Sequence, residues 1–97
     1  MLTEFIYITE DEKKKVLETY FKNGLDGAIT QFPNKEKRKM ILLQEVMKRF
    51  ERDKNYSEPE VNVILESVYS DSLSIRRELV EYGFMDCNKD GQFYWVV

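Results

Sequence analysis

The 97-residue chain contains no histidine, which removes the commonest general base and the commonest zinc ligand from its chemistry. Its single cysteine, Cys87, excludes an internal disulfide and agrees with a reducing cytoplasm. Carboxylate-only catalysis remains, but 18 acidic residues spread over a small domain form pairs by chance. We therefore predict a protein that is not an enzyme and that holds no metal and no cofactor.

Long apolar runs are also missing from the sequence, since no segment approaches the roughly 20 residues that a bilayer-spanning helix needs. Residues 1–15 lack the basic head, apolar stretch and cleavage site of a secretory signal. These features predict a cytoplasmic protein with no membrane partner. Glycine and proline are scarce, at 4 and 2 residues, and no repeat or linker divides the chain. We therefore expect one domain over residues 1–97.

Charge is distributed unevenly along the chain, although the net charge is only −3. Residues 1–33 carry 4 basic and 6 acidic side chains, which gives −2. Residues 34–54 carry 8 and 4, which gives +4, and residues 55–97 carry 3 and 8, which gives −5. A polyanionic partner should therefore prefer the middle segment.

Within the domain we expect an N-terminal extension, residues 1–28, and a core, residues 29–97. Residues 4–8 are β-forming, which predicts a short strand. Residues 9–12 (TEDE) form a capping-box pattern, and apolar side chains then recur at helical spacing. Asn23-Gly24 ends this helix, since such a pair favours the left-handed conformation found after helix C-termini.

The core begins with a helix predicted over residues 35–50, where apolar residues recur at steps of three and four. Residues 56–60 (YSEPE) predict the start of a second helix, because they combine a capping box with a proline in the first turn. A short polar turn, residues 70–72, leads to a third helix that has Asp71 as its N-cap and ends at Gly83. The last two helices form a helix-turn-helix unit.

The C-terminal residues predict a β-hairpin. Residues 84–88 and 92–97 are β-forming and are joined across Asp90-Gly91, a preferred pair for a type I′ turn. Tyr56 is positioned to add a short third strand. Helix, helix, turn, helix and hairpin follow in the order of a winged helix. We therefore predict an α+β, mainly helical fold: a winged helix, made of a helix-turn-helix and a C-terminal β-hairpin, with an additional N-terminal helix.

The stretch that starts at Asp86 also matches the first half of an EF-hand calcium loop. Such a loop needs a bidentate glutamate at its twelfth position, which here is Val97. The residues before Val97 are β-forming and aromatic and do not predict the helix that leaves such a loop. The hairpin is therefore the favoured interpretation.

The second helix of the helix-turn-helix would read the major groove if the protein bound DNA. Projected at 100° per residue, its outward arc holds Ser74 and Arg77, with Arg76 at the boundary. The arc also holds Glu78 and Glu81, which oppose the field of the phosphates. Further cations lie at the start of the first core helix and in the hairpin turn. The candidate DNA-binding residues are Arg76, Arg77, Ser74, Lys35, Lys37, Arg38, Lys39 and Lys89.

These candidates also have purely structural interpretations. Arg77 could pair with Glu81 or Asp71 and stiffen the helix. The basic residues at the start of the first core helix could form a solvated surface. The aromatic run Phe93–Trp95 could stack on single-stranded nucleic acid, but closing the core or a dimer interface is the favoured interpretation.

A set of short motifs covers most of the core: Phe32-Pro33, Lys35–Lys39, Tyr56, Glu58, Glu60–Asn62, Ile64-Leu65, Asp71, Arg76–Leu79, Tyr82-Gly83, Asp86, Asp90-Gly91 and Tyr94-Trp95. Over about residues 29–96 this set resembles domain-of-unknown-function family 2087, a winged-helix-like domain found alone or attached to prokaryotic transcriptional regulators. The resemblance implies a winged-helix fold and a transcription-linked role, but no catalytic residue, ligand or defined DNA site. Cys87 stands where the family often has arginine, which weakens any phosphate contact of the hairpin.

Two functions remain open from the sequence alone. In the first, a transcription-regulatory winged helix contacts double-stranded DNA through Arg76, Arg77 and the basic helix, as a homodimer. In the second, the domain is a non-enzymatic interaction or ligand-sensing module of a regulator, which associates with itself or with a regulator protein and does not bind DNA. The charge of the helix-turn-helix and hairpin favours the second function, and the family context favours the first.

Overall fold

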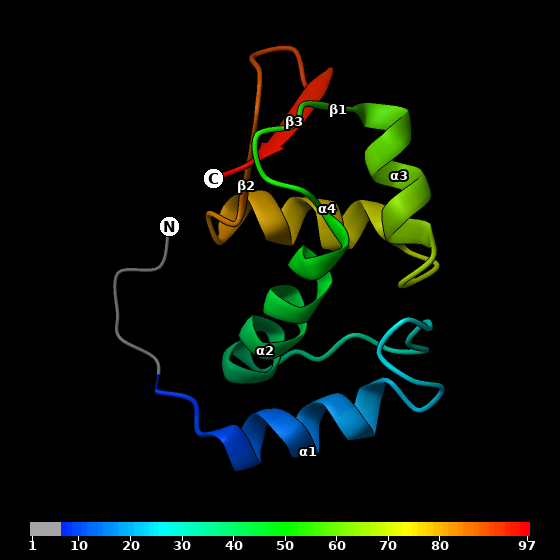
Figure 1. The fold of residues 1–97 in the computed structure, drawn as a ribbon, viewed down its shortest axis with the longest axis vertical. Helices are drawn as coiled ribbons and strands as arrows, with labels where there is room; N and C mark the ends of the chain where they lie inside the picture. The colour runs from blue at the N-terminus through cyan, green and yellow to red at the C-terminus, as the bar shows by residue number, and fades with distance from the viewer. Residues whose placement is uncertain (1–6) are drawn as a thin grey trace.

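Four α-helices, a short 3-10 helix and a small antiparallel sheet make up residues 7–97, the part of the chain that the computed structural model describes. In chain order they are α1 (Glu10–Tyr20), α2 (Glu36–Val46), η1 (Met47–Arg49), β1 (Tyr56–Ser57), α3 (Glu58–Glu66), α4 (Ser72–Glu81), β2 (Met85–Cys87) and β3 (Phe93–Val96). In Figure 1, α1 lies at one end of the molecule, the sheet lies at the other, and α2 and α4 lie between them. The fold is thus α+β and mainly helical, as predicted.

The helix starts are set by the side chains that the sequence predicts. Thr9 accepts a hydrogen bond from the Glu12 amide at 3.1 Å, and the Glu12 carboxylate accepts one from the Thr9 amide at 3.1 Å. Ser57 and Glu60 form the same reciprocal capping box at the start of α3, and Asp71 caps α4. These local bonds satisfy amide groups that the first turn of a helix leaves without a partner.

One predicted helix boundary is wrong, and one predicted strand lies mostly outside the described residues. The helix expected over residues 35–50 ends at Val46 and continues as η1, and Phe50 leaves it to pack edge-on against Tyr56 with 5.2 Å between ring centroids. The extended backbone at Phe50 allows this contact, and aromatic pairs of this kind are stabilising. The strand expected at residues 4–8 falls mostly on residues 1–6, which lie outside the described range, and Tyr7 and Ile8 do not belong to a strand.

The sheet has the strand order β1-β3-β2 and is antiparallel throughout. Tyr94 in β3 is the Cα partner of both Tyr56 and Cys87, which confirms the predicted hairpin and the short third strand. The turn differs from the type I′ prediction: the Gly91 amide donates to the Asn88 carbonyl at 3.0 Å, and Gly91 alone in this turn has a positive φ, of 67°. A glycine is needed there because side chains disfavour that conformation.

One hydrophobic core joins the helices to the inner face of the sheet. Its fully buried side chains are Ile41, Leu42, Leu43 and Val46 of α2, Val61 and Leu65 of α3, Val68 between α3 and α4, Ile75 and Leu79 of α4, and Met85 of β2. Helix α2 therefore occupies the centre, with Leu17 of α1 and Phe21, the C-cap of α1, packed on one side. Among the described residues no helix is long and apolar enough to span a bilayer.

Candidate interaction surfaces

The predicted DNA-contact residue Arg76 is held inside the domain. Its side chain is only 14% exposed, and its Nη1 donates to Oδ1 of Asn62 at 2.9 Å and lies 3.3 Å from a carboxylate oxygen of Glu58. Its Cζ lies 5.4 Å from the centroid of the Tyr94 ring, a favourable position for a cation. Arg76 thus links α4 to α3 and to β3, and its charge is engaged within the domain.

The outward face of α4 is left with a balanced charge. Lys39 of α2 binds Glu78 with 3.0 Å between Nζ and Oε1, and this hydrogen bond raises the pKa of Lys39. Arg77 and Glu81 are exposed, and Arg77 pairs with neither Glu81 nor Asp71 in the described part of the chain. One cation and one carboxylate therefore remain on this face.

Ser74, the other candidate on α4, takes part in the helix cap. Its amide and hydroxyl donate to the two carboxylate oxygens of Asp71 at 3.3 and 2.7 Å, and the hydroxyl bond is the main cause of the lowered pKa of Asp71. Beside Ser74, a shallow hollow of about 280 Å³ lies between residues 32–34 and α4, bordered by Lys39 and Arg77. The N-terminal end of α2 and the outward face of α4 therefore lie on one side of the molecule.

The basic start of α2 is divided between internal and exposed side chains. Lys37 pairs with Glu12 of α1, with 2.6 Å between Nζ and Oε2, and this contact is the main cause of the lowered pKa of Glu12. Lys35 and Arg38 are exposed and form no ion pair within residues 7–97. The structure therefore keeps Lys35 and Arg38, but not Lys37, as cations without an acidic partner.

Lys89 is exposed in the hairpin turn. The side-chain oxygens of the turn that could bind a cation accept hydrogen bonds from backbone amides. Oδ1 of Asp86 accepts from the Cys87 amide at 2.8 Å. Oδ1 of Asn88 accepts from the amides of Gln92 and Phe93 at 2.8 and 3.0 Å. These bonds shape a turn, as the hairpin interpretation of this stretch predicts.

A hollow of about 250 Å³ lies between α4 and the hairpin. The half-buried Cys87 lines it together with Arg76 and Arg77. The sequence does not predict this proximity, because Cys87 lies on another element ten residues after Arg77. The pair of cations is asymmetric, since Arg76 is already bound by Glu58 and Asn62. Arg77 and Glu81 also line this hollow and form no ion pair within residues 7–97, so they add one charge of each sign.

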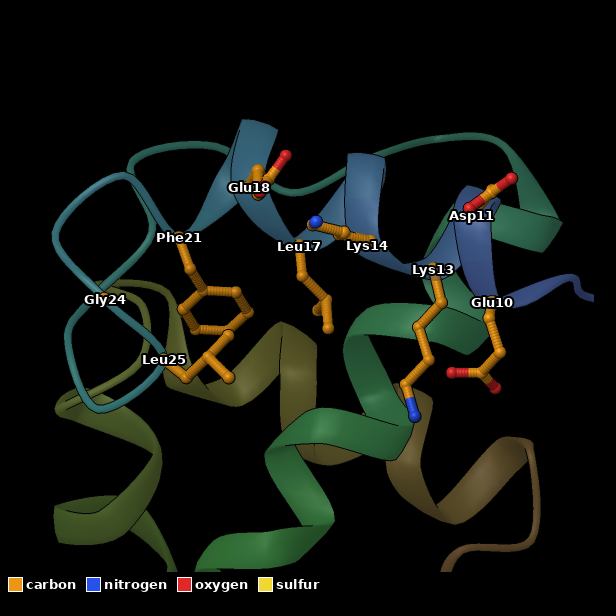
Figure 2. A pocket seen from close by; sticks show the side chains of 9 residues that line it. All are labelled: Glu10, Asp11, Lys13, Lys14, Leu17, Glu18, Phe21, Gly24 and Leu25. Carbon is orange, nitrogen blue, oxygen red and sulfur yellow. The ribbon is translucent and has the colours of Figure 1, made fainter.

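A groove of about 580 Å³, more than twice as large as either of these hollows, runs along α1. Figure 2 shows Leu17 and Phe21 on its inner side, Leu25 against the Phe21 ring, and Lys13 and Glu10 at the other end. From the sequence, Leu17 and Phe21 are predicted only as apolar residues at helical spacing, and the groove is not predicted. The steps of three and four from Glu10 to Phe21 indicate one face of α1, but the contribution of Leu25 depends on how the following loop folds back.

Fold and surfaces together define a small α+β domain with a charge-balanced outward face on α4 and an apolar groove along α1. Residues 28–96 match the model of a family described as "Uncharacterized protein conserved in bacteria (DUF2087)", and the chain belongs to this family. No match was found among curated proteins or among solved structures.

Proposed function

We propose that the protein is a winged-helix-like, non-enzymatic interaction module of a bacterial transcriptional regulator, which binds another protein and does not read DNA through α4. The inward position of Arg76 carries this proposal, because it removes one of the two arginines that a reading helix would use. Binding to DNA requires several phosphates to be neutralised. The outward face of α4 offers Arg77 against Glu81, while Lys39 and Glu78 neutralise each other.

Aromatic side chains on the outer face of the sheet favour a protein as the partner. Phe93 is 47% exposed, and the half-buried Trp95 lies two residues further along β3 on the same face, because side chains alternate along a strand. Asp86 is the Cα partner of Trp95 in the sheet, so a carboxylate flanks the aromatic pair. Exposed aromatic side chains are favoured at protein interfaces, and the acid beside them suits a partner that carries lysine or arginine.

The proposal is tested by titrating a labelled mixed-sequence duplex with the protein and following anisotropy at low and moderate salt. We expect no salt-sensitive binding at micromolar protein, whereas phosphate-driven binding must weaken steeply as salt rises. Salt-sensitive binding in this range would overturn the proposal.

A positive test uses Trp95, the only tryptophan of the chain, as a reporter. Its fluorescence should respond to a basic amphipathic peptide and not to an acidic peptide of the same length and apolar content. The Asp86→Asn variant should bind the basic peptide more weakly, because it removes the carboxylate beside the aromatic pair. An equal response to both peptides would count against this face as the binding surface.

A second candidate function is direct DNA contact through cations other than Arg76. It is favoured by the common position of Asn34, Lys39 and Arg77 around one hollow, which places the start of α2 beside α4. Lys35 and Arg38 would supply the remaining charge. If the wild type binds the duplex, replacing Lys35, Arg38 and Arg77 by alanine should reduce the salt slope by about 0.9 for each phosphate that is no longer neutralised.

A further inference from the structure

The groove along α1 is preformed, with an apolar floor. Leu17 and Phe21 are 8% and 4% exposed and form the floor, and Leu25 is 46% exposed at the edge. The loop that carries Leu25 is held in place, because Arg49 donates to the carbonyls of Leu25 and Gly27 at 2.8 and 2.7 Å. A partner can therefore enter this groove without first ordering the loop.

The order of charges along α1 is complementary to the same order read in the opposite direction. Residues 10–12 are acidic, residues 13–15 are basic, Glu18 is acidic and Lys22 is basic. When a second copy of this helix runs in the opposite direction with Lys14 opposite Glu18, Glu10 faces Lys22. A parallel second copy would instead place like charges together.

We infer that the groove along α1 binds a second copy of the chain, with the two α1 helices antiparallel about a two-fold axis near Leu17. Lys14 and Glu18, which both line the groove and are exposed, then form Lys14–Glu18 pairs between the copies, twice by symmetry. Of the apolar floor, Leu17 lies next to this axis and close to its counterpart in the second copy. Antiparallel helix dipoles add to the attraction.

The contact is small and therefore reversible. Helix α1 has 11 residues, and at 1.5 Å per residue its length of about 16 Å supports only an interface at the lower end of specific complexes. The inference goes beyond the proposed function, because the groove lies at the end of the molecule opposite the sheet and would work whether or not another protein binds Phe93 and Trp95.

Charge reversal in two separate variants provides the test, read by sedimentation velocity at low salt up to millimolar protein. The wild type should show a concentration-dependent dimer. Lys14→Glu and Glu18→Lys should each weaken self-association by about tenfold or more, because each replaces two attractive pairs by two repulsive ones. An equimolar mixture of the two variants should associate again, because the mixed dimer places the two carboxylates of the Lys14→Glu copy opposite the two ammonium groups of the Glu18→Lys copy.

The mixture separates contact from folding, since Lys14 and Glu18 are also four residues apart on one helix and each reversal weakens α1 by itself. Lys15→Glu is the matched control, because Lys15 is exposed on α1 but does not line the groove. For the apolar part, Leu25→Gln should weaken the dimer and Val63→Gln, which changes a 67%-exposed residue on α3, should not. A monomeric wild type at millimolar concentration, or mixed variants that stay monomeric while the wild type dimerises, would overturn the inference.

Discussion

The guanidinium of Arg76 lies over the ring of Tyr94, with 5.4 Å between Cζ and the ring centroid. Tyr94 is buried in the central strand of the sheet, and the same guanidinium reaches Asn62 on α3. One side chain therefore links the α3–α4 pair to the hairpin. A residue in that position supports the architecture, and its charge is shielded from a partner on the outward face of α4.

Replacing Arg76 by alanine should lower the free energy of unfolding by about 1–3 kcal/mol, because Asn62 and Glu58 lose a charged donor in a partly buried site. Thermal melts followed by circular dichroism would measure the loss. Arg77→Ala is the matched control on the next residue, and its exposed side chain predicts a change within about 0.5 kcal/mol. Equal stability of the two variants would contradict the structural role of Arg76.

The ion pair between Lys39 and Glu78 should couple α2 to α4. Each side chain is about one fifth exposed, at 22% and 18%, so a double-mutant cycle with Lys39→Met and Glu78→Gln should give a coupling energy of about 0.5–1 kcal/mol. Denaturant melts of the four proteins measure it. A coupling energy near zero would show that the two helices are held by their apolar contacts alone.

The same pair predicts a dependence on alkaline pH. Its partner raises the pKa of Lys39 above the ordinary value of 10.5, so the stabilisation is complete below that value and is lost as pH rises through the folded pKa. Burial also raises the pKa of Tyr82, so the ionisation of Tyr82 likewise lowers the stability of the protein as pH rises. In a Tyr82→Phe background, Glu78→Gln should therefore reduce the loss of stability above about pH 10.5.

Local chemistry made the helix starts predictable from the sequence. The capping boxes at Thr9 and Ser57 and the cap at Asp71 each involve residues within three positions, so their geometry follows from spacing alone. The hairpin is also formed by residues close in sequence, although its turn is centred on Lys89-Asp90, one residue before the predicted Asp90-Gly91.

Tertiary contacts decided the rest. Projection placed Arg76 at the boundary between the buried and outward arcs of its helix, and its contacts with Asn62 and Glu58 on α3 and Tyr94 on β3 turn it inward. The groove depends on a loop that Arg49 pins from 22 to 24 residues away. Neither partner can be chosen by periodicity, which orders residues within one element only.

Asp71 should stabilise the folded protein, and this contribution should be lost in acid. Hydrogen bonds from Ser74, the hydroxyl first, lower its folded pKa below the ordinary value of 3.8. Its contribution is therefore present above that value and is lost as pH falls through the folded pKa. Asparagine caps helices about as well and does not titrate, so Asp71→Asn should lose less stability below about pH 3.8 than the wild type. Melting temperatures measured from pH 5 to pH 2 test this.

The contacts of Glu12 and Glu60 also lower their pKa values, so their contributions to stability are lost in the same pH range and the curve of Asp71→Asn will be only partly flattened. Glu60→Gln, which retains the capping-box geometry, should flatten it further in combination with Asp71→Asn. Identical acid profiles for all three proteins would exclude caps as the origin of the acid sensitivity.

The hairpin turn should be indifferent to calcium and sensitive to Asn88. Oδ1 of Asn88 accepts from two backbone amides, and Asp86 is bound to the Cys87 amide, so both oxygens already have donors that a cation would have to displace. Asn88→Ala should lower stability by about 1–2 kcal/mol through loss of these two bonds. Lys89→Ala, in the same turn but exposed, is the control and should change little.

Thermal melts of the wild type in millimolar calcium chloride and in excess chelator should coincide within experimental error. A ligand that binds the folded state raises the melting temperature by an amount that grows with its concentration relative to the dissociation constant. A higher melting temperature in calcium that disappears in Asn88→Ala would therefore show that the half-pattern of a calcium loop binds the ion. Coincident curves, with the Asn88 variant destabilised equally in both solutions, would show that these side chains only shape the turn.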